Sequence, residues 1–217
     1  MKTKRLVVTI ALITVNIIVY LMMTFAGGST NPSTLIAFGA KDNALIAAGQ
    51  TWRLFTAMFL HIGFEHITLN MITLYFLGSQ IEYLFGAARY LVIYFVSGVG
   101  GNLASFAFNP DISASASTTL FGLFGAYLML GDAYRHNPYI HAIAKQFLIL
   151  VILNLIGDFS GAIDIWGHIG GLITGFFMGY TVETPRLGKV SSLKHWLSLV
   201  LIVILFVSVY NIGMQKF

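Results

Sequence analysis

Residues 165–182 are Ile-Trp-Gly-His-Ile-Gly-Gly-Leu-Ile-Thr-Gly-Phe-Phe-Met-Gly-Tyr-Thr-Val, an apolar stretch long enough to cross a bilayer as a helix. Within it, glycine occupies every fourth position, at Gly167, Gly171, Gly175 and Gly179. Residues four apart share a helix face, so these glycines form a groove on which another helix can pack closely. His168 adjoins the groove. The stretch therefore predicts a tightly packed membrane helix that holds an imidazole inside a bundle.

The composition of the whole chain agrees with a membrane location. Of its 217 residues, 57% are hydrophobic and 9% are charged, and the mean hydropathy is +0.82. Soluble domains carry about 25% charged residues, so we expect one integral membrane domain over 1–217. The chain has no cysteine, which excludes disulfides and zinc–thiolate sites.

Hydropathy along the chain predicts seven membrane-spanning helices: residues 6–25, 64–85, 90–108, 115–133, 142–159, 165–182 and 193–213. The first follows basic residues, as a signal peptide does. It is longer than a signal peptide's apolar region and ends without a small-residue cleavage pattern, so we expect a retained span. In the long connection over 26–63, the apolar piece 52–60 is too short to cross, and we expect it in the outer interface.

Alternating these spans across a bilayer divides the basic residues unequally. One side receives Lys2, Lys4, Arg5, Arg89, Arg135, Lys145, Arg186, Lys189 and Lys194. The other side receives Lys41, Arg53 and Lys216. By the positive-inside rule the first side is cytoplasmic, which places the N-terminus inside and the C-terminus outside. Topology thus accounts for the net charge of +4, and no nucleic-acid partner is expected.

Polar residues in three spans lie at a similar depth. His66 and Asn70 are in the first turns of the second span, Ser117 is in the first turn of the fourth, and His168 is in the first turn of the sixth. All three spans start at the outer face. Polar side chains inside a membrane usually line a cavity or pair with one another, so we expect these four residues to share a hydrated cavity just below the outer surface.

The four residues have the chemistry of acyl transfer. An imidazole activates a serine hydroxyl by accepting its proton, and the glycine groove lets the Ser117 helix approach His168. The side chains of His66 and Asn70 and the backbone N–H of Ser117 are candidate donors to an oxyanion. Asp158 and Asp164 lie nearer the outer loop, so the sequence favours a Ser–His dyad over a triad.

Each of these residues also has a structural interpretation. Membrane-embedded serines often bond to their own helix, and histidine or asparagine can serve only helix packing. A metal site is disfavoured because His61 and His66 are five residues apart and face different sides of a helix. No motif supports a haem, so no cofactor is expected. A small transporter or channel would also use a polar cavity, although paired repeats and broken helices are not visible.

The motifs together resemble the rhomboid family of intramembrane serine proteases, over about residues 49–179. The matching segments are Gly49-Gln-Thr-Trp-Arg53, His61-Ile-Gly-Phe-Glu-His-Ile-Thr-Leu-Asn-Met71, Gly78-Ser-Gln-Ile-Glu82 with Gly86, and Trp166-Gly-His-Ile-Gly-Gly171. The resemblance implies an all-α polytopic fold with a six-helix core over 1–182 and an appended seventh helix over 193–213. It also implies that Ser117 is the nucleophile and His168 the base. His66, Asn70 and the Ser117 amide would form the oxyanion hole.

One motif departs from the family pattern. The family's nucleophile motif is Gly-x-Ser-Gly, whereas this chain has Ser115-Ala-Ser-Thr118. Thr118 places a β-branched side chain where glycine would allow close approach, which affects donor geometry and substrate fit. An inactive rhomboid-like protein that binds membrane helices is therefore an alternative to a protease.

The resemblance further implies substrates that are themselves transmembrane proteins, cut near the outer face. They would enter past a gate formed by the fifth span and the loop 158–163. We expect a bacterial inner membrane as the location, and the sequence carries no signal for a particular oligomeric state.

Overall fold

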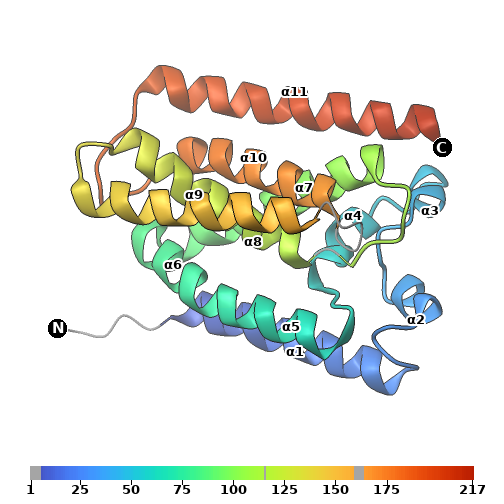
Figure 1. The fold of residues 1–217 in the computed structure, drawn as a ribbon. Helices are drawn as coiled ribbons and strands as arrows, with labels where there is room; N and C mark the ends of the chain where they lie inside the picture. The colour runs from blue at the N-terminus through green and yellow to red at the C-terminus, as the bar shows by residue number, and fades with distance from the viewer. Residues whose placement is uncertain (1–5, 115, 159–163) are drawn as a thin grey trace.

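A computed structural model describes residues 6–114, 116–158 and 164–217, except for the side chain of Asp158 (Figure 1). Lys2, Lys4, Arg5, Ser115 and most of the predicted gate loop therefore lie outside the described residues. The helices are α1 Val7–Phe25, α2 Pro32–Ala37, α3 Asn43–Ala47, α4 Arg53–Thr56, a 3₁₀ turn Ala57–Phe59, α5 Gly63–Thr73, a π-helical turn Leu74–Gly78, α6 Ser79–Phe85, α7 Ala87–Phe108, α8 Ala116–Ala133, α9 Pro138–Asp158, α10 Ile165–Val182 and α11 Ser192–Lys216. In the described residues every regular element is helical, which confirms the all-α prediction.

The helix bounds follow the predicted spans within a few residues. α10 matches 165–182, and the predicted span 64–85 is continuous through α5, the π-helical turn and α6. α9 begins at Pro138, earlier than predicted. The Asn137 side chain accepts hydrogen bonds from the backbone N–H groups of Tyr139 and Ile140 and so starts this helix. Proline is well suited to the first helical position that follows such a cap.

By length and composition, α1, α7, α9 and α11 qualify as membrane-crossing helices among the described residues. α8 and α10 have 18 residues each. Their glycines, hydroxyls and His168 keep the mean hydropathy of these two helices below that criterion. The second predicted span consists of α5, the π-helical turn and α6 in succession, and none of these elements alone has 18 residues. That the chain crosses the membrane seven times stays a prediction.

α10 is the central helix, and it packs most extensively against α8 and α7. Its glycines lie against the backbone of α8, because a Cβ on Gly171 would overlap the Thr118 carbonyl oxygen and one on Gly175 the Gly122 carbonyl oxygen. On α8, a Cβ on Gly125 would overlap the backbone of α10 at Leu172. The predicted glycine groove is therefore the contact between the fourth and sixth predicted spans. Such close approach favours dispersion contacts and excludes lipid between the helices.

A second set of close contacts, in which α7 packs against α10, was not predicted from the sequence. A Cβ on Gly100 would overlap the Thr174 side chain, and a Cβ on Gly170 would meet Ala104 and the Gly100 carbonyl. α7 also approaches α8, where Gly122 leaves room for the Ser97 hydroxyl. Small residues thus hold α7, α8 and α10 together as one three-helix core.

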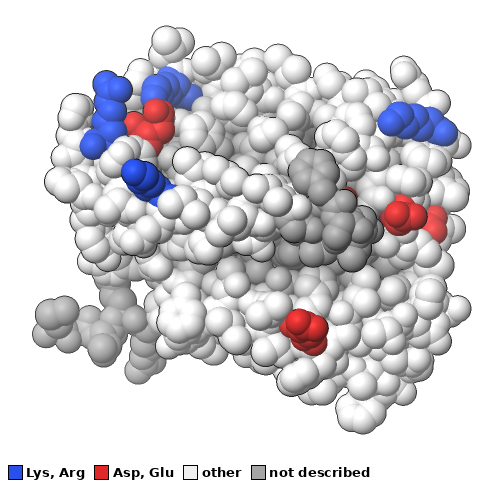
Figure 2. Space-filling view, viewed as in Figure 1, with Lys and Arg blue, Asp and Glu red and all other residues white. Residues whose placement is uncertain are grey.

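The remaining long helices lie around this core (Figure 1). α11 runs along one side, against α7 and α10, while α1 and α5 lie along another side, and α9 packs against α8. At its start α11 is joined to the core by Lys194, whose Nζ donates to Asp132 at 2.8 Å. Figure 2 shows most of the visible lysine and arginine side chains gathered at the end of the bundle where α11 begins.

The long connection between α1 and α5 folds into short helices beside α7. Its predicted interfacial piece, 52–60, is α4 with the 3₁₀ turn, and Trp52 and Phe55 are exposed. Arg53 is instead buried, because its guanidinium donates to the backbone carbonyls of Ile36 and Ala40. The Leu54 carbonyl accepts a bond from Asn102 of α7, which fixes the piece to the core.

Candidate active site

The structure brings Ser117 and His168 together. Ser117 lies in the first turn of α8 and His168 in the first turn of α10, and the glycine contacts hold these two helix starts side by side. The Ser117 Oγ lies 2.7 Å from the His168 Nε2, a hydrogen-bond distance. His168 is buried, whereas Ser117 is partly exposed. A serine in this position can lose its proton to the imidazole while its oxygen attacks an incoming group.

The imidazole of His168 is fixed by an aromatic ring that the sequence analysis did not single out. Phe121 lies one turn after Ser117 on α8, and its ring stacks on the His168 ring with centroids 3.9 Å apart and an interplanar angle of 11°. Stacking of this kind restricts rotation of the imidazole. The spacing of four residues after the nucleophile is the signal by which Phe121 could have been found.

His66 lies in the second turn of α5, which packs against α8. Its Nδ1 accepts the backbone N–H of Ile62 at 3.2 Å, so in the neutral ring the proton is on Nε2. A positive charge on His168 acts on the His66 imidazole, so the two rings lie near each other. His66 thus has one N–H to donate near the base.

The ring of His61 packs edge-on against the ring of His66, with centroids 5.3 Å apart. It precedes α5 and is fully buried. Burial, and to a smaller extent the neighbouring His66, lower the pKa of His61 to about 3. A neutral His61 adds no positive charge beside the His66 donor.

Asn70 lies one turn after His66 on the same face of α5 and is buried. Its amide Nδ2 has no hydrogen-bond partner among the described residues. Leaving a buried donor without a partner costs about 1–3 kcal/mol. A donor kept in this condition is suited to a ligand oxygen that is present only during a reaction.

Asp164 is the N-cap of α10, four residues before His168. Its Oδ1 accepts the Gly167 N–H at 3.0 Å, and its Oδ2 accepts hydroxyls from Ser113 and Ser105. The side chain of Asp158 lies outside the described residues. Among the described residues, no group of three or more His, Asp or Glu side chains is placed to hold a metal ion.

Comparison with known proteins gives the chain its family. Residues 48–184 match the family model described as the Rhomboid domain. The chain belongs to the rhomboid family. Together with its apolar helices, this membership makes it an integral membrane protein.

Rhomboid relatives share substantial identity with the chain. It is 40% identical to Rhomboid protease GluP of Bacillus subtilis (strain 168) over 209 residues, which are 96% of this chain and 41% of that protein. RHOMBOID-like protein 5 of Arabidopsis thaliana is 36% identical over 73% of this chain and 53% of its own length. Rhomboid-like protease 1 of Toxoplasma gondii is 34% identical over 67% of this chain and 52% of its own length. The chain thus spans about half or less of the length of these relatives.

The structure gives a packing role to the residue that departs from the rhomboid motif. Thr118 is 1% exposed, and its side chain lies where Cβ atoms on Gly101 and Gly167 would be. In this rhomboid the side chain therefore points into the α7–α8–α10 core, between two glycines that leave room for it. Ser115, the other departure, lies outside the described residues.

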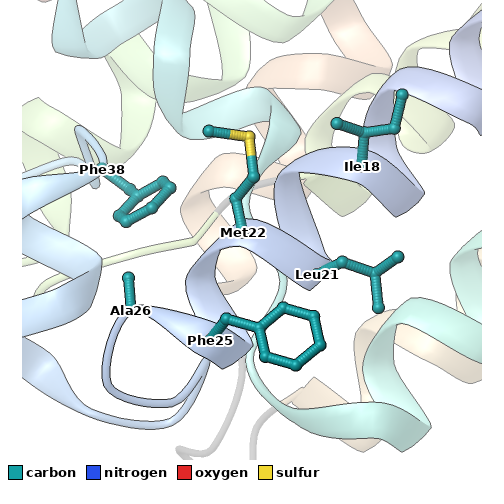
Figure 3. A pocket seen from close by; sticks show the side chains of 6 residues that line it. All are labelled: Ile18, Leu21, Met22, Phe25, Ala26 and Phe38. Atoms are coloured by element: carbon teal, nitrogen blue, oxygen red, sulfur yellow. The ribbon is translucent and has the colours of Figure 1, made fainter.

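A separate apolar pocket lies at the end of α1 (Figure 3). Ile18, Leu21, Met22, Phe25, Ala26 and Phe38 line it, and none of them carries a titratable or nucleophilic group. It contributes no residue to the Ser117–His168 site.

Proposed function

We propose that this rhomboid is an intramembrane serine protease that hydrolyses a peptide bond in or near the transmembrane segment of another membrane protein. The observation that carries the proposal is the 2.7 Å distance between the Ser117 Oγ and the His168 Nε2. Two further observations support it: the names of the relatives GluP and Rhomboid-like protease 1, and the unpartnered amide donor of Asn70.

In the proposed reaction, the Ser117 Oγ attacks the substrate carbonyl carbon while its proton moves to the His168 Nε2. The carbonyl oxygen becomes an oxyanion, which accepts hydrogen bonds from the His66 Nε2–H, the Asn70 Nδ2–H and the Ser117 backbone N–H. His168 then donates its proton to the leaving amine, and the peptide bond breaks to give an acyl-enzyme. A water, deprotonated by His168, hydrolyses the ester and restores Ser117. Phe121 keeps the imidazole in one plane throughout.

The proposed topology places this site near the outer face of the membrane. The N-terminus is cytoplasmic and the C-terminus extracytoplasmic, in a six-helix core with α11 as the appended seventh span. A spanning helix satisfies its backbone internally, so its peptide bonds are accessible only after local unwinding. Substrates should therefore have helix-weakening residues near the outer face, with a small side chain before the cut. α9 and the loop that follows it are the proposed entrance, and a bacterial inner membrane is the proposed location.

The test is cleavage in liposomes. The protein is reconstituted with a single-span model substrate, and the wild type is compared with Ser117→Ala and His168→Ala. We expect cleavage by the wild type and a loss of at least about 10³-fold in both variants. Cleavage that persists in either variant contradicts the dyad. A wild type that binds the substrate without cutting it indicates the inactive helix-binding alternative, and solute flux through the liposomes would favour a transporter.

A further inference from the structure

A second pair of side chains joins the same two chain segments as Ser117 and His168. The Ser113 Oγ donates to the Asp164 Oδ2 at 2.7 Å, and the Ser117 Oγ lies 2.7 Å from the His168 Nε2. Ser113 precedes Ser117 by four residues, and Asp164 precedes His168 by four residues. The two pairs are therefore consecutive links between the approach to α8 and the start of α10.

The Asp164 carboxylate accepts hydrogen bonds from three parts of the fold. Its Oδ2 accepts the Ser105 hydroxyl from α7 as well as that of Ser113, and its Oδ1 accepts the Gly167 N–H in the first turn of α10. The Asp164 carbonyl also accepts the His168 N–H at 3.1 Å. Hydrogen bonds to a charged acceptor are stronger than those between neutral groups. One carboxylate thus fixes α7, the segment before α8 and the backbone of the base relative to one another.

Ser113 is held from its other side by Lys41 of the connection between α1 and α5. The backbones of these two residues exchange N–H to carbonyl bonds of 3.0 Å in each direction. The Lys41 Nζ donates to the carbonyls of Asn109 and Asp111 at 2.7 and 2.6 Å and to the Asn43 Oδ1 at 3.0 Å. These bonds fasten the non-helical segment 109–113, which leads into α8.

Burying an ammonium group is costly unless it is paired and hydrogen-bonded. Lys41 is nonetheless fully buried. The negative charges of Asp164, Asp111 and Asp42 stabilise its ammonium group. All three of its N–H donors are used within the fold. These bonds fix the path of segment 109–113. That path determines where α8 begins and therefore where Ser117 lies.

We propose that Asp164 and Ser113 are positioning residues for the Ser117–His168 pair, and that Lys41 supports Ser113 from the connection between α1 and α5. This inference rests on the proposed protease function. A serine–imidazole pair works within a heavy-atom distance of about 2.6–3.2 Å, and a misplacement of about 1 Å can cost about 10²-fold in rate. The Ser113–Asp164 bond sets this distance because it joins the two segments four residues before the reacting side chains.

The experiment uses the full chain in detergent, with a fluorophosphonate as the probe. The rate of labelling of Ser117 is measured for the wild type, Ser113→Ala and Asp164→Asn, and kcat and KM are measured with the single-span substrate. Asparagine retains an oxygen that can cap α10 but removes the charge that accepts two hydroxyls. We expect both variants to lose about 10- to 100-fold in labelling rate and in kcat, with KM within about twofold because the substrate contacts are unchanged.

Two further variants separate positioning from folding. Ser113→Thr keeps the hydroxyl, and we expect it to recover most of the labelling rate. Ser97→Ala removes another fully buried hydroxyl, which donates within its own helix to the carbonyls of Ile93 and Tyr94, and we expect a rate within about twofold of the wild type.

Three outcomes would overturn the inference. Wild-type labelling rates in Ser113→Ala and Asp164→Asn, with the wild type itself reactive, contradict positioning but leave the protease proposal intact. A loss that only tracks a lower unfolding temperature, and that Ser97→Ala shares, assigns the bonds to stability alone. A wild type that neither reacts with the probe nor cleaves the substrate overturns the proposed function and the inference together.

Discussion

α10 and α11 are both long helices of one bundle, yet they are built differently. The buried positions of α10 are mostly glycines and polar residues, including His168, and its backbone touches those of α7 and α8. The most apolar 18-residue stretch of α11 has a mean hydropathy of 2.4, but only 17% of this stretch is buried, and Ile202 is one of the buried positions of the helix. Lipid is as apolar as leucine, so the exposed apolar side chains of α11 suit a helix that faces it. Close backbone contact marks the helices that build the site.

α9 belongs with α11 in this comparison. The most apolar 18-residue stretch of α9 is also only 17% buried, and Leu153 and Ile156 are among the exposed side chains of this helix. The core helices should therefore be sensitive to added bulk or lost polar groups, while α9 and α11 should tolerate both.

The largest expected effect comes from adding a side chain to the glycine contact. Gly175→Val places a Cβ where the Gly122 carbonyl oxygen lies, and backbone cannot yield as a flexible side chain can. We expect loss of the folded protein, a cost above about 3 kcal/mol, measured by detergent-resistant yield and thermal unfolding. Ala142→Val makes a similar addition on the exposed face of α9 and should leave both unchanged. Equal behaviour of the two variants would remove the distinction between core and periphery.

The next effect concerns two asparagines in different surroundings. Asn70 is buried with an unpartnered Nδ2, whereas the Nδ2 of Asn154 donates within exposed α9 to the Leu150 carbonyl at 2.7 Å. Because loss of one oxyanion donor typically costs about 10²–10³ in kcat, we expect that loss in Asn70→Ala and an unchanged kcat in Asn154→Ala. Steady-state cleavage of the single-span substrate measures both. If Asn70→Ala raised KM and left kcat alone, the residue would belong to substrate binding instead.

A smaller effect is expected at Thr118. Its side chain fills the space between Gly101 and Gly167, so Thr118→Gly should leave a cavity and loosen the first turn of α8. We expect a destabilisation of about 1–3 kcal/mol, seen as a lower unfolding temperature in detergent. Thr118→Ser, which removes only the methyl group, should cost less. A more stable Thr118→Gly would show that the threonine strains this site.

The smallest effect, taken per pH unit, concerns Lys41, which lies in the connection outside the spanning helices. Burial lowers its pKa from 10.5 to about 8, against the raising effects of Asp164, Asp111 and Asp42. Between these two pH values the unfolded chain keeps the proton that the folded chain has lost, so stability rises with pH. The slope is at most about 1.4 kcal/mol per pH unit. Thermal unfolding of the wild type and Lys41→Met is compared over this window. Stability should rise more steeply with pH in the wild type, and parallel slopes in the two proteins would contradict the assignment.

The same comparison explains what the sequence could predict. The positions of the long helices followed from hydropathy, and the α8–α10 contact followed from glycines at a spacing of four. Hydropathy did not separate the core helix α7 from α9 and α11. The shared depth of Ser117 and His168 was sufficient to predict that they meet, and the structure places them at hydrogen-bond distance.

The missed features depend on contacts between distant parts of the chain. Lys41 was assigned only a place in an outer loop, because its acceptors are backbone carbonyls 68 and 70 residues away. Backbone carbonyls carry no sequence signal. Gly100 and Gly101 are adjacent small residues in the sequence, but nothing in their positions identifies α10 as the partner.

The most direct test of the central claim is to find where a fluorophosphonate attaches. The wild type and the Ser117→Ala and His168→Ala variants are treated with the probe in detergent, and the modified residue is identified by peptide mass spectrometry. The account predicts one adduct, on Ser117, that is absent from Ser117→Ala and at least about 10²-fold slower to form in His168→Ala. An adduct on another serine, or equally fast labelling in His168→Ala, would contradict it.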